Sequence, residues 1–380
     1  MNVQAWHLPW GKRSVPHAVL DIIRGCNITC NACYNLSPPC TKSLVQIEQD
    51  LDCLMKRRQL TSLSIVGGEP LLHPNLCEII RRVKARGLHV ELCTNGVLLD
   101  SRKLHELQAA GLDVVFLHIE RGQQRSDMPT HPTREQLCAL WEEKTILVGS
   151  HGLDVGLTMT ASSDRLGEVK DIILFTLQSP HVNYLLVTLH RDVGSIDFIM
   201  GDLDSGMQGR HQKPLEQRED TLNTQIIWDY LSADLKLRPF AYLGSNVSLE
   251  NVRWLSYLVG SVTAGQTAYH SLRASSFEKL FLFMSWIFGG RYPMYRKQSS
   301  VALLIELLLN GLTGGDLAGN LSFFMKAIKA RKSTRTKRLL FQCPAEVGSD
   351  GRIIHCMNCP DAVVRKGKLV PVCISDRVRS

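Results

Sequence analysis

The sequence has no apolar run long enough to cross a membrane. The dense apolar stretch LFLFMSWIF covers only residues 280–288, and VALLIELLLNGL at 301–312 contains Glu306, whereas a spanning helix needs about 20 apolar residues. The sequence also lacks a basic start leading into an apolar segment, as a secretory signal would have, and it lacks internal repeats. These absences predict a cytoplasmic protein, or one that sits peripherally at the inner face of a membrane.

The composition is that of a globular protein with little disorder. Hydrophobic residues make up 44% and charged residues 21% of the 380 residues, which suits one large domain with an appended one. The net charge of +8 is uneven, because KAIKARKSTRTKR at 326–338 holds seven Lys or Arg and no acid. Such a run is either a solvated face or a docking site for phospholipid headgroups, RNA phosphates or an acidic carrier protein.

The twelve cysteines are concentrated in two places. Seven lie in clusters at 26–33 and 343–373, and five are scattered: Cys40, Cys53, Cys77, Cys93 and Cys138. Because cytosolic thiols stay reduced, the clusters indicate metal binding rather than disulfides. We expect the scattered cysteines to be small buried hydrophobic side chains.

Short apolar runs alternate with helical patterns over the first 200 residues. Strands are predicted at 17–23, 60–66, 89–96, 113–120, 154–162 and 183–192, and helices at 46–59, 75–87, 101–111, 134–152 and 168–179. This order predicts an α/β fold with parallel strands, either a partial (βα)6 barrel or an open sheet. Right-handed crossovers place every strand-to-helix loop at one end.

The alternation stops at residue 200. A Gly-rich and charged segment at 201–220 is predicted to be a linker, and 222–331 has mainly helical patterns. We therefore expect a core at 15–200, a mainly helical substrate or partner region at 201–340, and a small cysteine-rich subdomain at 341–380.

The first cluster, CNITCNACYN, places Cys26, Cys30 and Cys33 in a C-x3-C-x2-C spacing. Thiolates select zinc, copper(I) or iron–sulfur clusters, but a structural zinc site needs four ligands and no matching fourth ligand lies nearby. Three thiolates on a [4Fe–4S] cube leave one iron open, an arrangement that favours chemistry over structural support.

A C-x3-C-x2-C loop after the first strand of a β/α barrel resembles the radical S-adenosylmethionine (SAM) superfamily. That resemblance implies a [4Fe–4S] cluster at Cys26, Cys30 and Cys33, with SAM bound to the open iron. It also gives a role to GGEP, which is Gly67, Gly68, Glu69 and Pro70. In the family such a motif offers backbone carbonyls and a carboxylate to the SAM ammonium, and glycine permits close approach of the backbone.

Other strand ends add residues that the resemblance places around SAM. Asn95 belongs to CTNG at 93–96, and His118, Glu120 and Thr160 lie at the ends of the fourth and fifth strands. The family usually has an aromatic residue before the third cysteine, where this chain has Ala32. Tyr34 is the alternative ring for the adenine, and a flavodoxin- or ferredoxin-like protein is the implied electron donor.

The second cluster contains Cys343, Cys356, Cys359 and Cys373 in a C-x12-C-x2-C-x13-C pattern. One interpretation is a zinc or single-iron knuckle. The other is an auxiliary [4Fe–4S] cluster, because the C-x2-C-x13-C half resembles the molybdenum-cofactor GTP 3′,8-cyclase and shortened SPASM extensions. The chain ends in DRVRS without the double glycine of that cyclase, and Cys343 can close the cluster, which favours electron relay or structural support.

These patterns predict a radical SAM enzyme that cleaves SAM reductively and takes a hydrogen atom from a substrate. The apolar, aromatic segment KLFLFMSWIFGGRYPMY at 279–295 is either helical core or an interfacial region for a lipid-like or isoprenoid substrate. A peptide is the other substrate class, and no RNA-binding module is recognisable. The alternatives are a non-catalytic iron–sulfur or zinc scaffold and a GTP-cyclase-like enzyme of cofactor biosynthesis.

Overall fold

The computed structural model describes residues 5–35, 38–190, 198–199, 222–262, 267–294, 300–330, 334–348, 353–376 and 378–379. The predicted linker at 201–220 and residues 331–333 of the basic run lie outside these described residues. Among the described residues, no helix is both long and apolar enough to span a membrane.

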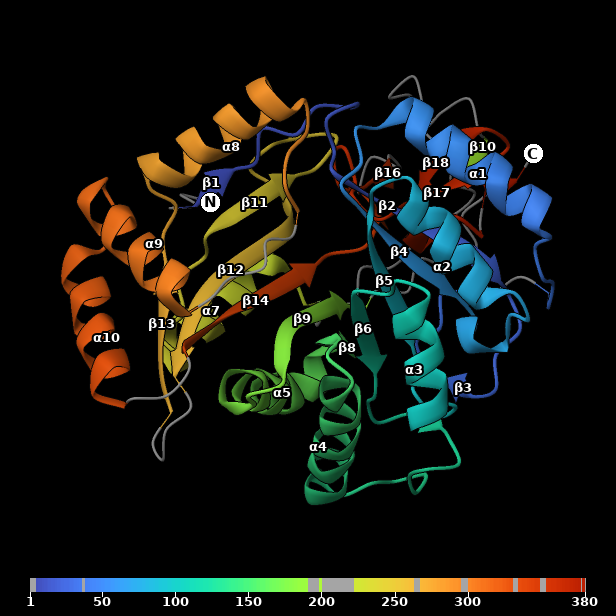
Figure 1. Cartoon of the computed structure of the whole chain (residues 1–380), viewed down its shortest axis with the longest axis horizontal. Helices are drawn as coiled ribbons and strands as arrows, with labels where there is room; N and C mark the ends of the chain where they lie inside the picture. Colours follow the sequence, from blue (N-terminus) through green and yellow to red (C-terminus); the bar gives the residue numbers. More distant parts are fainter. Residues whose placement is uncertain are drawn as a thin grey trace.

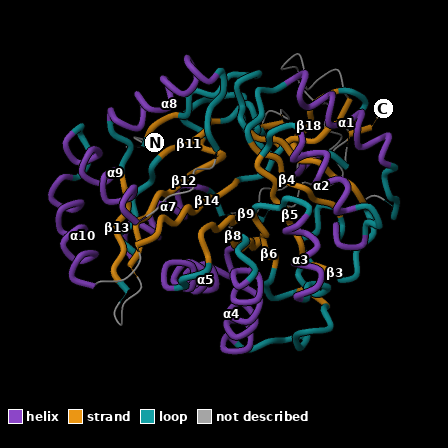
Figure 2. Tube along the Cα trace, in the orientation of Figure 1, coloured by secondary structure: helices purple, strands orange, loops and turns teal. Residues whose placement is uncertain are grey.

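Six parallel strands form the first half of the molecule (Figure 1). They are β2 (His17–Ile23), β4 (Ser62–Gly67), β5 (His89–Thr94), β6 (Val114–His118), β8 (Asp154–Ala161) and β9 (Val182–Leu189), and they are neighbours in chain order. The helices between them are α1 (Leu44–Arg57), α2 (Leu76–Ala85), α3 (Ser101–Ala109), α4 (Arg134–Ser150) and α5 (Leu166–Gln178). The predicted (βα)6 arrangement is confirmed, with the helices on one face of the curved sheet (Figure 2).

Alternation along the strands separates the two faces of this sheet. On β5, Val90 and Leu92 are fully buried in the core shared with the helices, whereas Glu91 and Cys93 line a cavity on the inner side. On this strand, the apolar residues therefore pack against the helices, and Glu91 and Cys93 face the cavity.

The sheet continues past β9 with strands from the second half of the chain. β14 (Thr334–Gln342) pairs parallel with β9, and β12 (Val252–Val262) pairs antiparallel with β14. β11 (Ala241–Gly244), β13 (Ala268–Leu272) and β1 (Trp6–His7) complete this extension, and α7 (Thr224–Asp234), α8 (Ser276–Gly289), α9 (Ser300–Leu312) and α10 (Leu317–Ala330) pack around it. The prediction of a mainly helical region here missed these strands. A signal was present for β12, because its sequence VRWLSYLVGSV is rich in β-branched and aromatic residues.

The cysteine-rich tail folds back onto the first strand of the barrel. It contains β15 (Glu346–Val347), β16 (Ile353–Ile354), β17 (Ala362–Arg365), β18 (Lys368–Pro371) and the 3-10 helix η3 (Val372–Ile374). Arg365 pairs with Asp21 of β2 at 2.9 Å, and Arg58 donates to the backbone oxygen of Cys359 at 2.7 Å. These contacts place the C-terminal end of the chain beside α1 (Figure 1).

The scattered cysteines are less buried than predicted. Cys40 is exposed, and Cys53, Cys77, Cys93 and Cys138 are half-buried. Cys40 lies in the loop that leads from the first cysteine cluster to α1. The expectation of small buried side chains is therefore wrong for Cys40.

Candidate functional site

Cys26, Cys30 and Cys33 lie on the loop between β2 and α1, which we call the cysteine loop (residues 26–33). Cys26 and Cys33 are exposed and Cys30 is half-buried. Cys30 belongs to the short strand β3 (Thr29–Cys30), which pairs with β7 (Gln123–Gln124) after β6. The loop is thus fixed to the barrel at its middle cysteine, while its outer two thiols remain accessible.

The donor set of the cysteine loop suits a cationic cluster. Burial raises the pKa of the Cys30 thiol to about 12, and the nearby Cys33, Glu120 and Cys26 add to that rise. Three thiolates so close together repel one another, so holding all three deprotonated requires bound positive charge, and thiolate is the ligand of iron–sulfur clusters. The residues present therefore fit such a cluster.

Gly67 and Gly68 end β4 against the backbone that enters the cysteine loop. A Cβ on Gly68 would lie 2.3 Å from the carbonyl oxygen of Gly25, and one on Gly67 would lie 2.3 Å from that of Ile23. The backbone N–H of Gly68 donates to Ile23 O at 2.8 Å, and that of Glu69 donates to Gly25 O at 2.8 Å. Glycine is thus required here to bring the GGEP segment and the cysteine loop together.

Glu69 is fully buried and joins the ends of β4 and β5. Its carboxylate accepts hydrogen bonds from the Thr94 hydroxyl at 2.7 Å, the Asn95 backbone N–H at 2.8 Å and the Leu71 backbone N–H at 3.0 Å. Burial raises the pKa of Glu69, against the lowering effect of these bonds. A carboxylate has about four acceptor positions, so about one remains for a ligand. Pro70 follows as the first residue of the 3-10 helix η1 (Pro70–Leu72).

Asn95 connects the end of β5 to the cysteine loop. Its side-chain N–H donates to Asn27 Oδ1 at 2.8 Å and lies 3.9 Å from Cys26 Sγ. Its side-chain oxygen accepts from the Val97 backbone N–H at 3.0 Å. Asn95 therefore positions the first cysteine as well as the turn that it belongs to.

The remaining predicted residues lie at the same end of the barrel. His118 Nε2 is 3.4 Å from a carboxylate oxygen of the buried Glu120, and Glu120 accepts from the Thr160 backbone N–H at 2.5 Å. Tyr34 is half-buried and follows Cys33 directly. The structure thus gathers the three cysteines, Glu69, Asn95, His118 and Glu120 around one loop cluster, where Thr160 contributes through its backbone.

Arg125 was not predicted, yet it holds this cluster together. Its side chain is completely buried and donates to Asn95 O at 2.8 Å, to Gln123 Oε1 at 2.8 Å and to Asp127 at 2.6 Å. It therefore ties the CTNG turn to the β7 segment that pairs with Cys30. A single arginine in a polar loop carries no periodic signal by which the sequence could reveal it.

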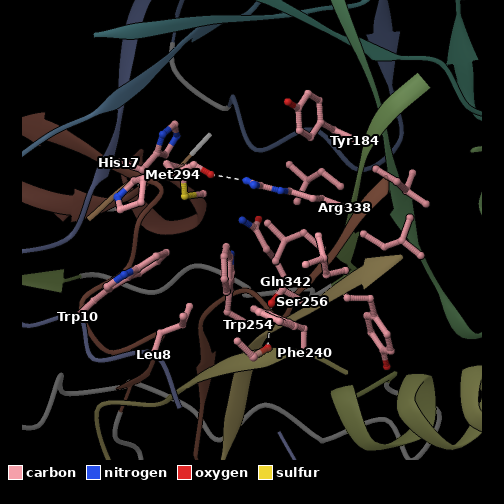
Figure 3. A pocket seen from close by; sticks show the side chains of 18 of the residues that line it. Leu8, Trp10, His17, Tyr184, Phe240, Trp254, Ser256, Met294, Arg338 and Gln342 are labelled. Atoms are coloured by element: carbon pink, nitrogen blue, oxygen red, sulfur yellow. Dashed lines mark hydrogen bonds between the residues drawn. The ribbon is translucent and has the colours of Figure 1, made fainter. Parts of the chain in front are cut away.

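A cavity of about 230 Å³, which we call the lumen cavity, lies on the inner side of the sheet (Figure 3). Its walls are mainly apolar and aromatic, and they include Trp10, Phe116, Tyr184, Phe240 and Trp254. The strands that contribute to this lumen cavity are β2, β4, β5, β6, β9, β11, β12 and β14, together with helices α8 and α9. Because β12 and β14 were not predicted, the cavity could not be predicted either.

One wall of the lumen cavity is polar. His17 lies 2.7 Å from Ser62 Oγ and 3.2 Å from Ser64 Oγ, and Ser64 donates to Glu91 at 2.7 Å. Burial lowers the pKa of His17 to about 3, with Arg58 and His89 adding to the effect. His17 is therefore neutral, so its contacts of 3.8 Å with Glu91 and 3.7 Å with Asp361 are not ion pairs.

The four tail cysteines, Cys343, Cys356, Cys359 and Cys373, lie between two buried arginines. Arg58 is electrostatically close to Cys359 and Cys356, and Arg253 is close to Cys343 and Cys373. Burial raises the pKa of Cys373 to about 12, which opposes free thiolates at this site. Buried cations beside four thiols suit a negatively charged metal–thiolate centre.

Among the described residues, no three His, Cys, Asp or Glu side chains converge closely enough to bind one metal ion. A [4Fe–4S] cube makes a different demand, because each thiolate binds its own iron.

The cysteine loop and GGEP lie within a segment that other proteins share. Residues 20–144 match the model of the Radical SAM superfamily. This chain contains a radical SAM domain. The family implies a [4Fe–4S] cluster and SAM as cofactors, and the loop cluster around Cys26, Cys30 and Cys33 is where the domain offers ligands for them.

Three curated relatives illustrate the range of the family. GTP 3′,8-cyclase of Chlorobaculum tepidum is 37% identical over 112 residues, covering 28% of this chain and 34% of that protein. PqqA peptide cyclase of Streptomyces rochei is 25% identical over 158 residues, 40% and 43% of the two chains. The subtilosin biosynthesis protein AlbA of Bacillus subtilis is 29% identical over 160 residues, 41% and 35% of the two. The chain spans less than half the length of each of these relatives.

Proposed function

We propose that this protein is a radical SAM enzyme that binds SAM at the cysteine loop and takes a hydrogen atom from a substrate in the lumen cavity. When bound, the cluster supplies one electron that cleaves SAM to methionine and a 5′-deoxyadenosyl radical. The observation that carries this proposal is the direct link between the cysteine loop and the GGEP and CTNG turns, made by Gly68, Glu69 and Asn95. A non-catalytic scaffold would have no use for a SAM pocket at these turns.

The residues of the chain have distinct tasks in this reaction. Cys26, Cys30 and Cys33 would hold the [4Fe–4S] cluster and would leave one iron available to SAM. Glu69 orients the turn at Asn95 and offers its remaining acceptor position to the SAM ammonium. His118, Glu120, Thr160 and Tyr34 are proposed to line the rest of the SAM pocket. The apolar walls of the lumen cavity exclude water, which keeps a reactive radical from side reactions.

The tail cysteines are proposed to hold a second [4Fe–4S] cluster. Arg58 and Arg253 supply positive charge beside it, and four thiolates leave no iron open. Such a cluster would relay electrons or support the tail rather than bind substrate. The match to GTP 3′,8-cyclase covers only 28% of the chain and does not extend this proposal to GTP cyclisation.

The substrate is proposed to be a peptide or a lipid-like molecule, and the electron donor a flavodoxin- or ferredoxin-like protein. One relative is named for a peptide substrate, the PqqA peptide cyclase. The mainly apolar lumen cavity suits either an apolar side chain of a peptide or a segment of a lipid. We likewise propose the peripheral contact with a membrane that the sequence predicts.

SAM turnover tests the proposed function. Protein reconstituted anaerobically with iron and sulfide should form 5′-deoxyadenosine and methionine when dithionite and SAM are added together, and neither product when one of them is omitted. Chromatography of the quenched mixture measures both products. A protein that holds its clusters but forms no 5′-deoxyadenosine would be a scaffold.

A further inference from the structure

Helices α8, α9 and α10 expose an unusual amount of apolar surface. They carry 15 of the 22 exposed large hydrophobic side chains found in the described part of the chain. These three helices lie together at the end of the molecule opposite α1 and the C-terminus (Figure 1). A soluble monomer rarely exposes so many large apolar side chains at one end of the molecule.

The exposed side chains form regular stripes. On α9 they are Val301, Ile305, Leu309 and Leu312, and on α10 they are Leu317, Leu321, Met325 and Ile328. Both sets repeat at intervals of three or four residues, so each occupies one face of its helix. The opposite faces, with Leu303, Leu307, Phe323 and Ala327, pack in the core with Leu258 and Leu272 of the sheet. The stripes therefore point away from the protein.

Helix α8 is apolar on two sides. Phe277, Phe281 and Leu282 line the lumen cavity, whereas Phe283, Ile287 and Phe288 are at least half exposed. Helix α8 therefore separates the lumen cavity from the outside, and it presents apolar side chains both to the cavity and to the outer surface.

The exposed charged side chains of this region have one sign. Lys279, Arg291, Lys326 and Lys329 are exposed. The acids of the described ranges 276–294 and 300–330 are Glu278 and Glu306, which are buried, and Asp316, which is half-buried and 3.8 Å from Arg238. An apolar face with a mainly basic fringe is complementary to an anionic lipid surface. A second copy of the chain would bring like charges together, which disfavours that occupant.

We propose that the stripes of α8, α9 and α10, the apolar face, dock this protein on an anionic phospholipid bilayer. The helices lie in the headgroup region with their basic fringe against lipid phosphates. The docking does not depend on the radical chemistry. Docking would place α8 between the bilayer and the lumen cavity, and the idea that this cavity takes a lipid-like substrate rests on the proposed function.

Co-sedimentation of the reconstituted full-length protein with vesicles tests the docking. The protein should bind vesicles of phosphatidylcholine and phosphatidylglycerol in equal parts more tightly than phosphatidylcholine alone. Phe283→Glu/Ile287→Glu should weaken binding by about tenfold or more, because two apolar anchors are lost. Val45→Glu is the matched control: Val45 is 67% exposed on α1, away from the apolar face, and this change should leave binding unaltered.

The basic fringe has its own test. Lys326→Glu/Lys329→Glu should lower binding to the mixed vesicles, and added salt should reduce this difference. Wild-type protein that binds neither vesicle, or variants that bind like wild type, would overturn the proposal. So would a wild-type dimer that Phe283→Glu/Ile287→Glu converts to a monomer, since a second copy would then cover the apolar face. Vesicle binding needs no SAM cleavage, so failure of the docking and failure of the proposed function are separate results.

Discussion

Replacing Cys26, Cys30 and Cys33 together by alanine should lower the formation of 5′-deoxyadenosine by at least about a thousandfold, because the only three thiolates of the cysteine loop are lost. The effects of substitutions do not add up when the residues act as a unit. Cys30→Ala alone should therefore lower the formation of 5′-deoxyadenosine nearly as much as the triple change. Chromatographic quantification of 5′-deoxyadenosine after reaction with SAM and dithionite measures the effect. The half-buried Cys138 on α4 provides the control, since Cys138→Ala should keep full turnover.

Metal analysis of the same triple variant tests the tail cysteines. About four irons and four sulfides should remain bound per chain if Cys343, Cys356, Cys359 and Cys373 hold a cube. One zinc or one iron instead would show a knuckle site and would refute the auxiliary cluster. Turnover that persists in the triple variant would remove the cysteine loop from the chemistry altogether.

Gly68→Ala should disrupt the site through the backbone alone. The new methyl group would lie 2.3 Å from Gly25 O and 2.6 Å from Arg24 O, and backbone atoms cannot move aside as the end of a flexible side chain can. Overpacking of this kind costs about 1–3 kcal/mol. The added methyl group should also lengthen the hydrogen bond from the Glu69 N–H to the carbonyl oxygen of Gly25, which is the residue before Cys26. Thermal unfolding should show a lower midpoint, and SAM binding should weaken in parallel.

Gly25→Ala is the matched control for this prediction. Gly25 lies on the other side of the same contact, but a Cβ there would meet nothing within 4 Å. The control should therefore unfold and bind SAM much like the wild type. If Gly68→Ala behaved like Gly25→Ala in both measurements, the close packing of GGEP against the cysteine loop would not matter for the site.

The barrel was predictable because its signals are local. β2 has the bounds His17–Ile23 that its apolar run indicates, and α3 begins at Ser101 after the cap Asp100, as its periodicity predicts. The clustering of Cys26, Glu69 and Asn95 also follows from the sequence, since the carboxyl ends of neighbouring parallel strands meet at one end of a barrel.

Features that depend on distant pairings were not predictable. β14 pairs with β9 in a register that places Arg338 opposite Tyr184. The periodicity within either strand does not show which other strand it will pair with. The same holds for the pairing of Arg365 with Asp21, which brings the tail onto β2. The sequence predicted that Gly67 and Gly68 help to bind SAM. The structure adds that these glycines leave room for the backbone that enters the cysteine loop.

The open iron at the cysteine loop is the central claim, and electron–nuclear double resonance tests it most directly. SAM carrying an oxygen-17 label in its carboxylate should show hyperfine coupling to the reduced cluster in wild-type protein. The coupling should persist in a Cys356→Ala/Cys359→Ala variant and disappear in the Cys26→Ala/Cys30→Ala/Cys33→Ala variant. Absence of coupling in the wild type, or its survival without the three loop cysteines, would contradict the account.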